Sequence, residues 1–338
     1  MIVVMKKDAA AADIADVVAR VKGDGYVPHI SEGDMRTIIG LVGESPTPLR
    51  EDNYSTMNGV EKVMRVSAPY KLASRDFHPK DTHVALNGSQ AGAGKVLVIA
   101  GPCSVESREQ IIEIACAMKE MGATALRGGA YKPRTSPYSF QGHGEKGLEW
   151  LAEARAMTGL PIVTEVMDPA LVPVVARYAD VLQVGARNMQ NFVLLNEVGK
   201  SGHTVLLKRG MANTMEDLLM SAEYILAHGN GNVMLCERGI RTFEKYTRNT
   251  FDLNAIPVLK ARTHLPIIAD PSHAVGYSEF VEKVALAAVA AGADGLIVEV
   301  HPTPAQAMSD GRQSLDYKGF KSMMESVKRV AAAVGRNA

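Results

Sequence analysis

The sequence is poor in several residue types, and each shortage excludes a class of protein. Its 338 residues include three cysteines and one tryptophan, and aromatic residues make up 5%. Three cysteines are too few, and odd in number, for a disulfide framework. No apolar run approaches the roughly 20 residues needed to span a bilayer, and the first residues lack the basic start and apolar core of a secretory signal. These absences predict a cytoplasmic protein with no membrane segment.

The chain also lacks an excess of either charge. Lys plus Arg number 37 and Asp plus Glu number 37, so the formal net charge is zero. A neutral chain has no overall field that would draw it to nucleic acid or to an anionic membrane. It also lacks the basic stripe, rich in aromatics, that nucleic-acid binding would favour. Any anion-binding site must therefore be local.

What the sequence does have, from Lys95 onward, is an alternation of apolar runs with helical patterns. The runs predict eight strands, at residues 96–100, 123–127, 161–165, 181–184, 204–208, 232–236, 266–269 and 295–299. Helix signals lie between them, including a capping box of Ser107 with Gln110 and a helix start at Thr214. An open doubly wound sheet would show the same local pattern, but eight strand–helix units favour a (β/α)8 TIM barrel, an α/β fold.

The first 67 residues have a different pattern. Apolar runs at 1–5, 37–42 and 60–66 and an amphipathic segment at 13–21 predict a small ferredoxin-like α+β domain over residues 1–67. We expect residues 68–94 to link this domain to a catalytic barrel over residues 95–338. Within the link, residues 84–86 are expected to pair with 96–98 in a hairpin that closes the N-terminal mouth of the barrel.

The segment after the second predicted barrel strand is suited to anions. Arg127 ends the apolar run, and Gly128 and Gly129 then allow another group to approach the backbone closely. Residues 132–136 offer ammonium, guanidinium and hydroxyl donors on a loop whose φ angles two prolines partly fix. A solvated basic loop is the commoner fate of such residues. The cations directly follow a buried-looking strand, however, which favours a phosphate or carboxylate site.

A TIM barrel carries its chemistry on the loops that follow the strand C-termini. Those positions hold Cys103, Arg127, Lys132, Glu165, Arg187, Lys208, Arg238, His273, Glu299, His301 and Asp310. The cations among them would crowd one mouth of the barrel with little acid to balance them. Such a density of positive charge is costly unless an anionic ligand completes it.

Four of these residues also form a plausible metal-ligand set. Cys103, His273, Glu299 and Asp310 supply a thiolate, an imidazole and two carboxylates. This donor set suits a divalent ion such as Mn²⁺, Fe²⁺, Co²⁺ or Zn²⁺ better than Mg²⁺. Taken singly, each has a structural explanation, as a buried thiol, a hydrogen-bonded histidine or a turn residue. Their shared face of the predicted barrel favours the metal.

Seven motifs together resemble the synthases of 3-deoxy-D-arabino-heptulosonate 7-phosphate (DAHP). They are Ala100-Gly-Pro-Cys103-Ser, Lys132-Pro133-Arg134-Thr135, Gly185-Ala186-Arg187-Asn, Leu207-Lys208-Arg-Gly, Cys236-Glu-Arg238-Gly, Asp270-Pro-Ser-His273 and Val298-Glu299-Val-His301-Pro. The resemblance extends from about Tyr70 to the C-terminus. It is strongest to the short microbial subgroup, in which a small domain precedes the barrel.

The resemblance implies a metal-dependent condensation of phosphoenolpyruvate with erythrose 4-phosphate and water. The products would be DAHP and phosphate, in the first step of the shikimate pathway to aromatic amino acids. The family's metal ligands fall on the four residues named above. Its substrate-binding residues fall on Arg127, Lys132, Ala186, Arg187, Lys208 and Arg238 for phosphoenolpyruvate, and on Pro133, Arg134, Thr135 and Ser136 around the phosphate of the aldose.

Catalytic roles are expected for four residues. Lys132 would lie between the two substrates, and Glu165 and Lys208 would position the attacking water or move its proton. His301 would support the metal from behind, donate a proton to the new alkoxide, or be structural.

Three alternative functions remain at this point. A 3-deoxy-D-manno-octulosonate 8-phosphate synthase would use the same barrel and phosphoenolpyruvate, but with an Asn-Arg-Ser type of loop where this chain has Pro133-Arg134-Thr135. A metal-dependent aldolase would need no second carboxylate clamp. A non-enzymatic amino-acid sensor would explain the small domain but not the charged barrel mouth.

The resemblance also implies feedback control through the N-terminal domain. Tyrosine or phenylalanine is the expected inhibitor, and His29 and Ser31 are the candidate contacts. The alternative is that His29 and Ser31 bind no ligand and only end a strand, and that the domain serves oligomer assembly. We expect a homo-oligomer, with a tetramer favoured.

Overall fold

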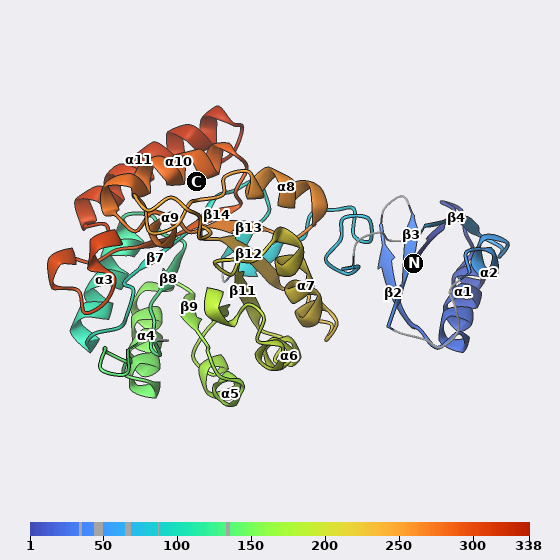
Figure 1. The fold of residues 1–338 in the computed structure, drawn as a ribbon, viewed down its shortest axis with the longest axis horizontal. Helices are drawn as coiled ribbons and strands as arrows, with labels where there is room; N and C mark the ends of the chain where they lie inside the picture. The colour runs from blue at the N-terminus through green and yellow to red at the C-terminus, as the bar shows by residue number, and fades with distance from the viewer. Residues whose placement is uncertain (34–35, 44–49, 65–68, 87, 133–135) are drawn as a thin grey trace. The chain divides into compact units, whose positions relative to one another are not determined.

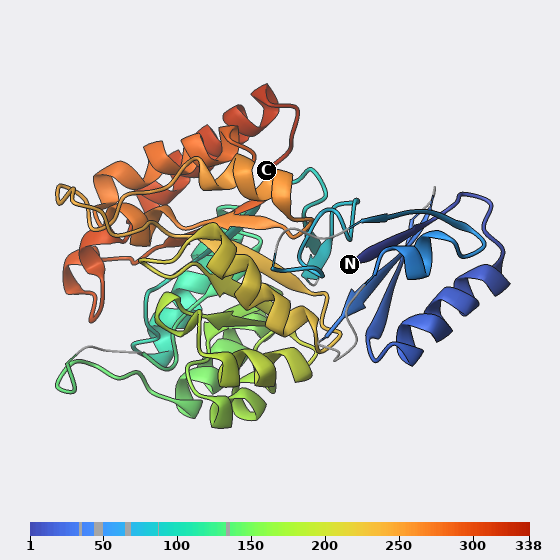
Figure 2. The same ribbon diagram turned by 45° about the vertical axis from the view of Figure 1, so that its right-hand side comes forward.

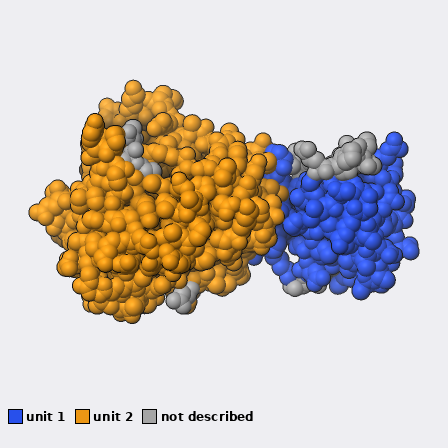
Figure 3. Space-filling view, turned by 90° about the horizontal axis from the view of Figure 1, so that it is seen from below, with its two compact units in different colours: residues 1–81, 262–264 blue, residues 82–261, 265–338 orange. Residues whose placement is uncertain are grey.

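The computed structural model describes all of the chain except residues 34–35, 44–49, 65–68, 87 and 133–135. The described residues form two compact units, coloured separately in Figure 3. The N-terminal unit comprises residues 1–81 and 262–264, and the barrel unit comprises residues 82–261 and 265–338. Within the described ranges, no helix is long and apolar enough to cross a membrane.

The N-terminal unit is built on a four-stranded antiparallel sheet. Its elements are β1 (Ile2–Met5), α1 (Ala11–Gly23), β2 (Val27–Glu32), β3 (Thr37–Val42), α2 (Asp52–Ser55) and β4 (Val60–Met64). The strand order β2-β3-β1-β4 is that of a ferredoxin-like fold, as the sequence predicts (Figure 2). Val17 and Val21 of α1 pack with Ile39 and Leu41 of β3 in one buried cluster.

The opposite face of this sheet is covered by the segment that follows β4. Tyr70, Leu72 and Phe77 are buried, and the Phe77 ring lies so close to Gly40 that an added Cβ would come within 2.4 Å of it. His29 and Ser31 also lie on this face, because they pair with Gly40 and Ile38 in the β2–β3 ladder. Both side chains are half-buried.

Eight parallel strands close the barrel, which confirms the predicted (β/α)8 architecture (Figure 1). They are β7 (Leu97–Gly101), β8 (Ala125–Arg127), β9 (Ile162–Glu165), β10 (Val181–Val184), β11 (Thr204–Lys208), β12 (Val233–Glu237), β13 (Ile267–Ala269) and β14 (Gly295–Glu299). The order runs from β7 to β14, and β14 pairs with β7 to close the ring.

Helices follow the strands and surround them (Figure 1). They are α3 (Arg108–Glu120), α4 (Glu145–Thr158), α5 (Val172–Ala176), α6 (Phe192–Lys200), α7 (Met215–Leu226), α8 (Ala255–Arg262), α9 (Pro271–Val275), α10 (Ser278–Ala290) and α11 (Tyr317–Ala333). Thr214 and Asp217 form a reciprocal capping box at α7. The box predicted at α3 is only half formed: Ser107 accepts from Gln110 N, but the Gln110 side chain accepts from Glu106 N.

The predicted hairpin exists, but with a different second strand. β5 (Val84–Leu86) pairs with β6 (Ser89–Ala91), not with residues 96–98, which open β7 and the barrel. The chain turns at Gly88, whose φ of 89° favours glycine. Val84, Leu86 and Ala91 share one buried cluster with the inward-facing residues of the barrel strands, so the hairpin does plug the barrel interior.

Candidate active site

A cavity of about 380 Å³ lies at the C-terminal ends of the barrel strands. Of the predicted site residues, its lining includes Arg127, Lys132, Ser136, Glu165, Ala186, Arg187, Lys208, Arg238, His273 and Asp310. Strands and short helices deliver these side chains from separate parts of the sequence, as a parallel barrel allows. Pro133, Arg134 and Thr135 lie outside the described residues.

Cations dominate the lining of this cavity. Among the described residues, seven cations line it, Arg127, Lys132, Arg187, Lys208, Arg238, Arg241 and Arg248, against two acids, Glu165 and Asp310. Arg127 is 4% exposed, and its Nε and Nη1 atoms have no hydrogen-bond partner among the described residues. Buried donors without partners are costly in a folded protein. The cavity is therefore suited to a ligand that carries several negative charges.

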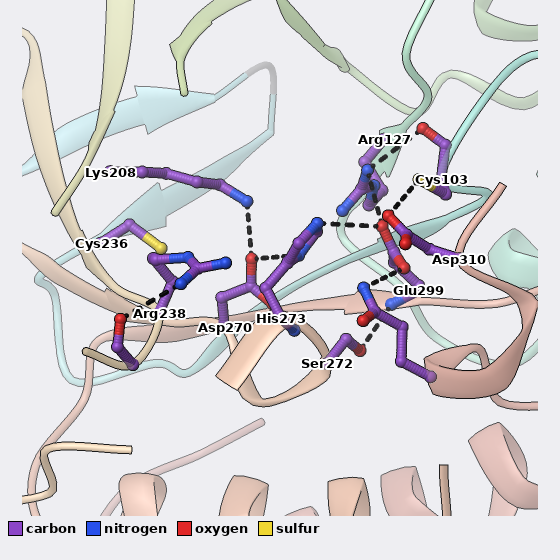
Figure 4. Close-up of polar contacts among 12 residues, drawn as sticks. Cys103, Arg127, Lys208, Cys236, Arg238, Asp270, Ser272, His273, Glu299 and Asp310 are labelled. Carbon is purple, nitrogen blue, oxygen red and sulfur yellow. Dashed lines mark hydrogen bonds and ion pairs between the residues drawn. The ribbon is translucent and has the colours of Figure 1, made fainter. Parts of the chain in front are cut away.

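The four predicted metal ligands converge beside the cavity (Figure 4). One ligand atom from each of Cys103, Glu299 and Asp310 lies within 4.8 Å of the others. Cys103 Sγ is 3.3 Å from Asp310 Oδ2, and His273 Nε2 is 3.4 Å from Glu299 Oε1. Cys103, Glu299 and Asp310 thus form one cluster, and the His273 imidazole adjoins it through Glu299.

The environment of Glu299 fits a cation. Its carboxylate is fully buried, and Oε1 accepts no hydrogen bond from the described residues although His273 Nε2 and Arg127 Nη2 lie within 3.4 Å. Burial raises the pKa of the neighbouring Cys103 thiol to about 12, with Glu299 adding to the effect and Lys132 opposing it. A thiol that coordinates a metal ion binds as the deprotonated thiolate. The donor set therefore fits a divalent ion bound between these side chains.

Asp270 holds the His273 ring in place (Figure 4). Its Oδ2 accepts from His273 Nδ1 at 2.8 Å and from Lys208 Nζ at 2.6 Å, and its Oδ1 accepts from His273 N at 3.0 Å. Because a carboxylate can only accept, Nδ1 carries the proton and the Nε2 lone pair faces Glu299. Burial lowers the pKa of His273, which keeps the ring neutral and able to bind a metal.

Lys132 and Glu165 both line the cavity. Lys132 Nζ lies 3.0 Å from both the carbonyl oxygen and the Sγ of Cys103, so it contacts the metal-ligand cluster directly. Glu165 Oε2 accepts from Gln183 Nε2 at 3.4 Å and lines the cavity. Both side chains are thus within the site to which the sequence assigns them.

The whole chain is similar to proteins of one enzyme family. The sequence model of the DAHP synthetase I family matches residues 79–335, and that of the DAHP synthase ferredoxin-like domain matches residues 1–68. The chain belongs to the DAHP synthetase I family. A phospho-2-dehydro-3-deoxyheptonate aldolase of Thermotoga maritima is 51% identical over 335 residues, which cover 99% of each chain.

Other relatives are more distant or cover less of the chain. A 2-dehydro-3-deoxyphosphooctonate aldolase of Azoarcus sp. is 33% identical over 266 residues, which cover 72% of this chain and 94% of the relative. The crystal structure of the Thermotoga DAHP synthase superposes with a TM-score of 0.80 at 50% identity, covering 99% of this chain and 98% of that one. Its truncated form covers 79% of this chain, with a TM-score of 0.74.

The His301 side chain contacts residues outside the cavity lining. His301 Nδ1 accepts from Thr303 N at 3.0 Å, and Nε2 is 3.4 Å from Glu106 Oε2. Within the described part of the chain, His301 is not among the residues that line the cavity. These contacts favour a structural role, and proton donation by His301 stays an untested prediction.

Several residues of the site were given no role in the sequence analysis. Asp270 lies in the Asp270-Pro-Ser-His273 motif, and its position three residues before His273 could have indicated a contact with that side chain. Arg241 and Arg248 follow β12 in a long loop and line the cavity. Gln313 follows Asp310 by three residues and donates to Glu299 Oε2 at 2.7 Å. No motif or periodicity marks these three.

Proposed function

We infer that this chain is a DAHP synthase, which condenses phosphoenolpyruvate with erythrose 4-phosphate and water to give DAHP and phosphate. One observation carries this conclusion: the chain is 51% identical, over nearly its whole length, to a phospho-2-dehydro-3-deoxyheptonate aldolase. Octonate-forming relatives are 33% identical and match about three quarters of the chain or less. The cationic cavity agrees with two phosphorylated substrates.

The cations of the cavity would bind phosphoenolpyruvate. Its carboxylate and phosphate together need several donors, and the buried Arg127 and the nearby Lys132, Arg187, Lys208 and Arg238 supply them. Ser136, with Arg134 and Thr135, would bind the phosphate of the aldose. Two anionic ends fixed in this way would hold C3 of phosphoenolpyruvate against the aldehyde carbon.

The residues of the metal cluster would hold a divalent ion, with Mn²⁺, Fe²⁺, Co²⁺ and Zn²⁺ as candidates. A bound ion would supply Lewis acidity toward the aldehyde oxygen. Attack by C3 leaves positive charge at C2, where water adds. Glu165 and Lys208, which line the cavity, would orient this water or take its proton. The bridging oxygen then leaves C2 with the phosphate, whose charge the cavity cations stabilise.

The choice of aldose tests the assignment against its nearest alternative. We expect kcat/KM for erythrose 4-phosphate to exceed that for arabinose 5-phosphate by at least a hundredfold. The reverse order would transfer the chain to octulosonate phosphate synthesis. Arg134→Ala should raise KM for the aldose much more than KM for phosphoenolpyruvate, because it removes a phosphate contact from one substrate only.

The ferredoxin-like domain would regulate the barrel. A TIM barrel needs no appendage for this chemistry, and His29 and Ser31 place an imidazole and a hydroxyl on one face of β2. Tyrosine or phenylalanine, end products of the pathway, are the proposed inhibitors. Pairing of such domains between subunits of a homo-oligomer, with a tetramer favoured, would let one ligand favour an inactive arrangement.

A further inference from the structure

Two side chains outside the predicted ligand set hold both of its carboxylates. Arg248 Nη1 lies 3.2 Å from Asp310 Oδ1 and donates to Gln313 Oε1 at 2.7 Å. Gln313 Nε2 in turn donates to Glu299 Oε2 at 2.7 Å. Asp310 and Glu299 are thereby joined through one guanidinium and one amide, on the side of the cluster away from Cys103.

The orientation of the Gln313 amide is fixed by its partners. A guanidinium can only donate and a carboxylate can only accept. The amide oxygen must therefore face Arg248, and the amide nitrogen must face Glu299. Gln313 is 2% exposed and Glu299 is fully buried, so water cannot readily substitute for the contact between them.

These contacts divide the four carboxylate oxygens into two pairs. Glu299 Oε2 and Asp310 Oδ1 are engaged by Gln313 and Arg248. Glu299 Oε1 faces His273 Nε2 at 3.4 Å and Arg127 Nη2 at 3.2 Å, and Asp310 Oδ2 faces Cys103 Sγ at 3.3 Å. Each acid thus presents one oxygen to the metal ligands and has its other oxygen occupied.

The backbone around this network is tied to the helix that carries His273. Arg248 N donates to Val275 O at 2.9 Å, and Asn249 Nδ2 donates to His273 O at 2.8 Å. Gly276 has a φ of 75°, and a Cβ there would come within 2.4 Å of Arg248 Cβ. On the other side Asp310 has a φ of 51°, in the left-handed region that residues other than glycine rarely adopt. The contact between Arg248 and Asp310 therefore joins the loop after β12 to the loop after β14.

We propose that Arg248 and Gln313 are positioning residues that restrict Glu299 and Asp310 to one metal-facing oxygen each, and so select a transition-metal ion over Ca²⁺. Calcium takes six to eight oxygen ligands and often uses both oxygens of a carboxylate. A site with one thiolate, one imidazole and two single oxygens instead suits Mn²⁺, Fe²⁺, Co²⁺ or Zn²⁺. The proposal rests on the metal site proposed above, but concerns residues outside its ligand set.

The test measures metal binding by the full-length, metal-free protein. Mn²⁺ affinity is determined by the EPR signal of the unbound ion, and Ca²⁺ affinity by competition. The variants are Arg248→Met, Gln313→Leu and the double variant. Arg312→Met is the matched control, because Arg312 stacks over the Tyr277 ring, 3.9 Å from its centroid, instead of holding a carboxylate.

We expect each single variant to bind Mn²⁺ about 10- to 100-fold more weakly, the usual effect of losing a partner of a metal ligand. Ca²⁺ affinity should stay the same or rise, because Arg248→Met frees the second oxygen of Asp310 and Gln313→Leu frees that of Glu299. The preference for Mn²⁺ over Ca²⁺ should fall at least tenfold. The double variant should lose little more than the worse single variant, since the two residues act through one network, and Arg312→Met should behave as the unmodified chain.

A preference that is unchanged in both folded single variants would overturn the proposal. If Gln313→Leu does not fold, Gln313→Glu replaces it: this substitution keeps an acceptor for Arg248 but removes the donor to Glu299, and the same loss of preference is expected. An unmodified chain that binds no Mn²⁺ would overturn the metal site and the proposal together. A normal wild-type affinity with unaffected variants overturns the proposal alone.

Discussion

At the scale of single residues, the proposed metal site depends on the ligands and also on the residues that hydrogen-bond to those ligands. Cys103 is 3% exposed and contacts both Lys132 and Asp310. It is also the softest of the four proposed ligands, and ligand softness governs which divalent ions a site prefers. Its replacement therefore tests the site most selectively.

We expect Cys103→Ser to lower the affinity for Mn²⁺ or Zn²⁺ at least tenfold and to remove most activity. A serine hydroxyl is harder than a thiolate and does not ionise in this buried position. Isothermal titration of the metal-free protein measures the affinity. Cys116→Ser, in helix α3 outside the ligand set, is the control and should bind metal normally. Equal affinity in both variants would exclude Cys103 as a ligand.

Asp270→Asn tests the orientation of His273. An amide in place of the carboxylate can donate to Nδ1, which would favour the tautomer whose proton sits on Nε2, facing Glu299. We expect about a 10- to 100-fold loss of metal affinity. Asp168→Asn makes the same change at the cap of an exposed turn and should have no effect on metal binding. Metal affinity unchanged by Asp270→Asn would contradict the proposed role of Asp270.

The ligands at the strand ends could be predicted from the sequence, but the residues behind them could not. Eight apolar runs locate the strand ends, and chemistry in a barrel follows those ends. Arg248 and Asp310, however, are 62 residues apart. Their contact depends on how two loops fold, and apolar periodicity carries no information about loops.

At the scale of elements, the segment 70–81 is packed by a histidine from a distant part of the chain. His264 Nε2 donates to Leu72 O at 2.8 Å, and its ring stacks on His78 with centroids 4.3 Å apart. Burial lowers the pKa of His264 to about 4, with His78 and Arg75 adding to the effect and the Leu72 carbonyl and Asp81 opposing it. The ring is therefore neutral in the folded protein at neutral pH.

This lowered pKa predicts a loss of stability in mild acid. Below about pH 6.5 the unfolded chain takes up a proton at His264 that the folded chain refuses until about pH 4. Within that window, protonation of His264 in the unfolded chain lowers the free energy of unfolding by about 1.4 kcal/mol per pH unit. His264→Gln keeps a donor for Leu72, so denaturant unfolding of the full chain should show a smaller loss between pH 7 and pH 5 than wild type. Equal losses would contradict this account.

Element types were predicted more reliably than their partners. The eight barrel strands have strong apolar runs and are confirmed, whereas the second hairpin strand was wrong. The strand Ser89–Ala91 has no apolar run, because only Ala91 is buried in the core and the two residues before it are polar and less buried. Two further glycines, Gly92 and Gly94, follow Gly88, so the sequence alone does not locate the turn.

At the scale of the whole molecule, the chain joins a catalytic barrel to a unit that the chemistry does not require. The truncated Thermotoga DAHP synthase matches 79% of this chain at 50% identity, so a related barrel exists without the N-terminal unit. Deletion of residues 1–67 therefore tests whether the proposed regulation can be separated from catalysis.

We expect tyrosine or phenylalanine to inhibit the full chain and not a variant that lacks residues 1–67. His29→Ala, which leaves the barrel sequence unchanged, should weaken inhibition without lowering uninhibited activity. Steady-state rates with increasing amino acid measure the effect, and sedimentation of each variant reports its assembly. No inhibition of the full chain would leave the N-terminal unit with a role in assembly only.

The most direct test of the account is phosphate release from phosphoenolpyruvate by metal-free and Mn²⁺-reconstituted protein, with and without erythrose 4-phosphate. We predict one phosphate per DAHP formed, only when the aldose and the metal are both present. EDTA should abolish the release, and added Mn²⁺ should restore it. Phosphate release without erythrose 4-phosphate, or full activity after rigorous metal removal, would contradict the central claim of a metal-dependent condensation.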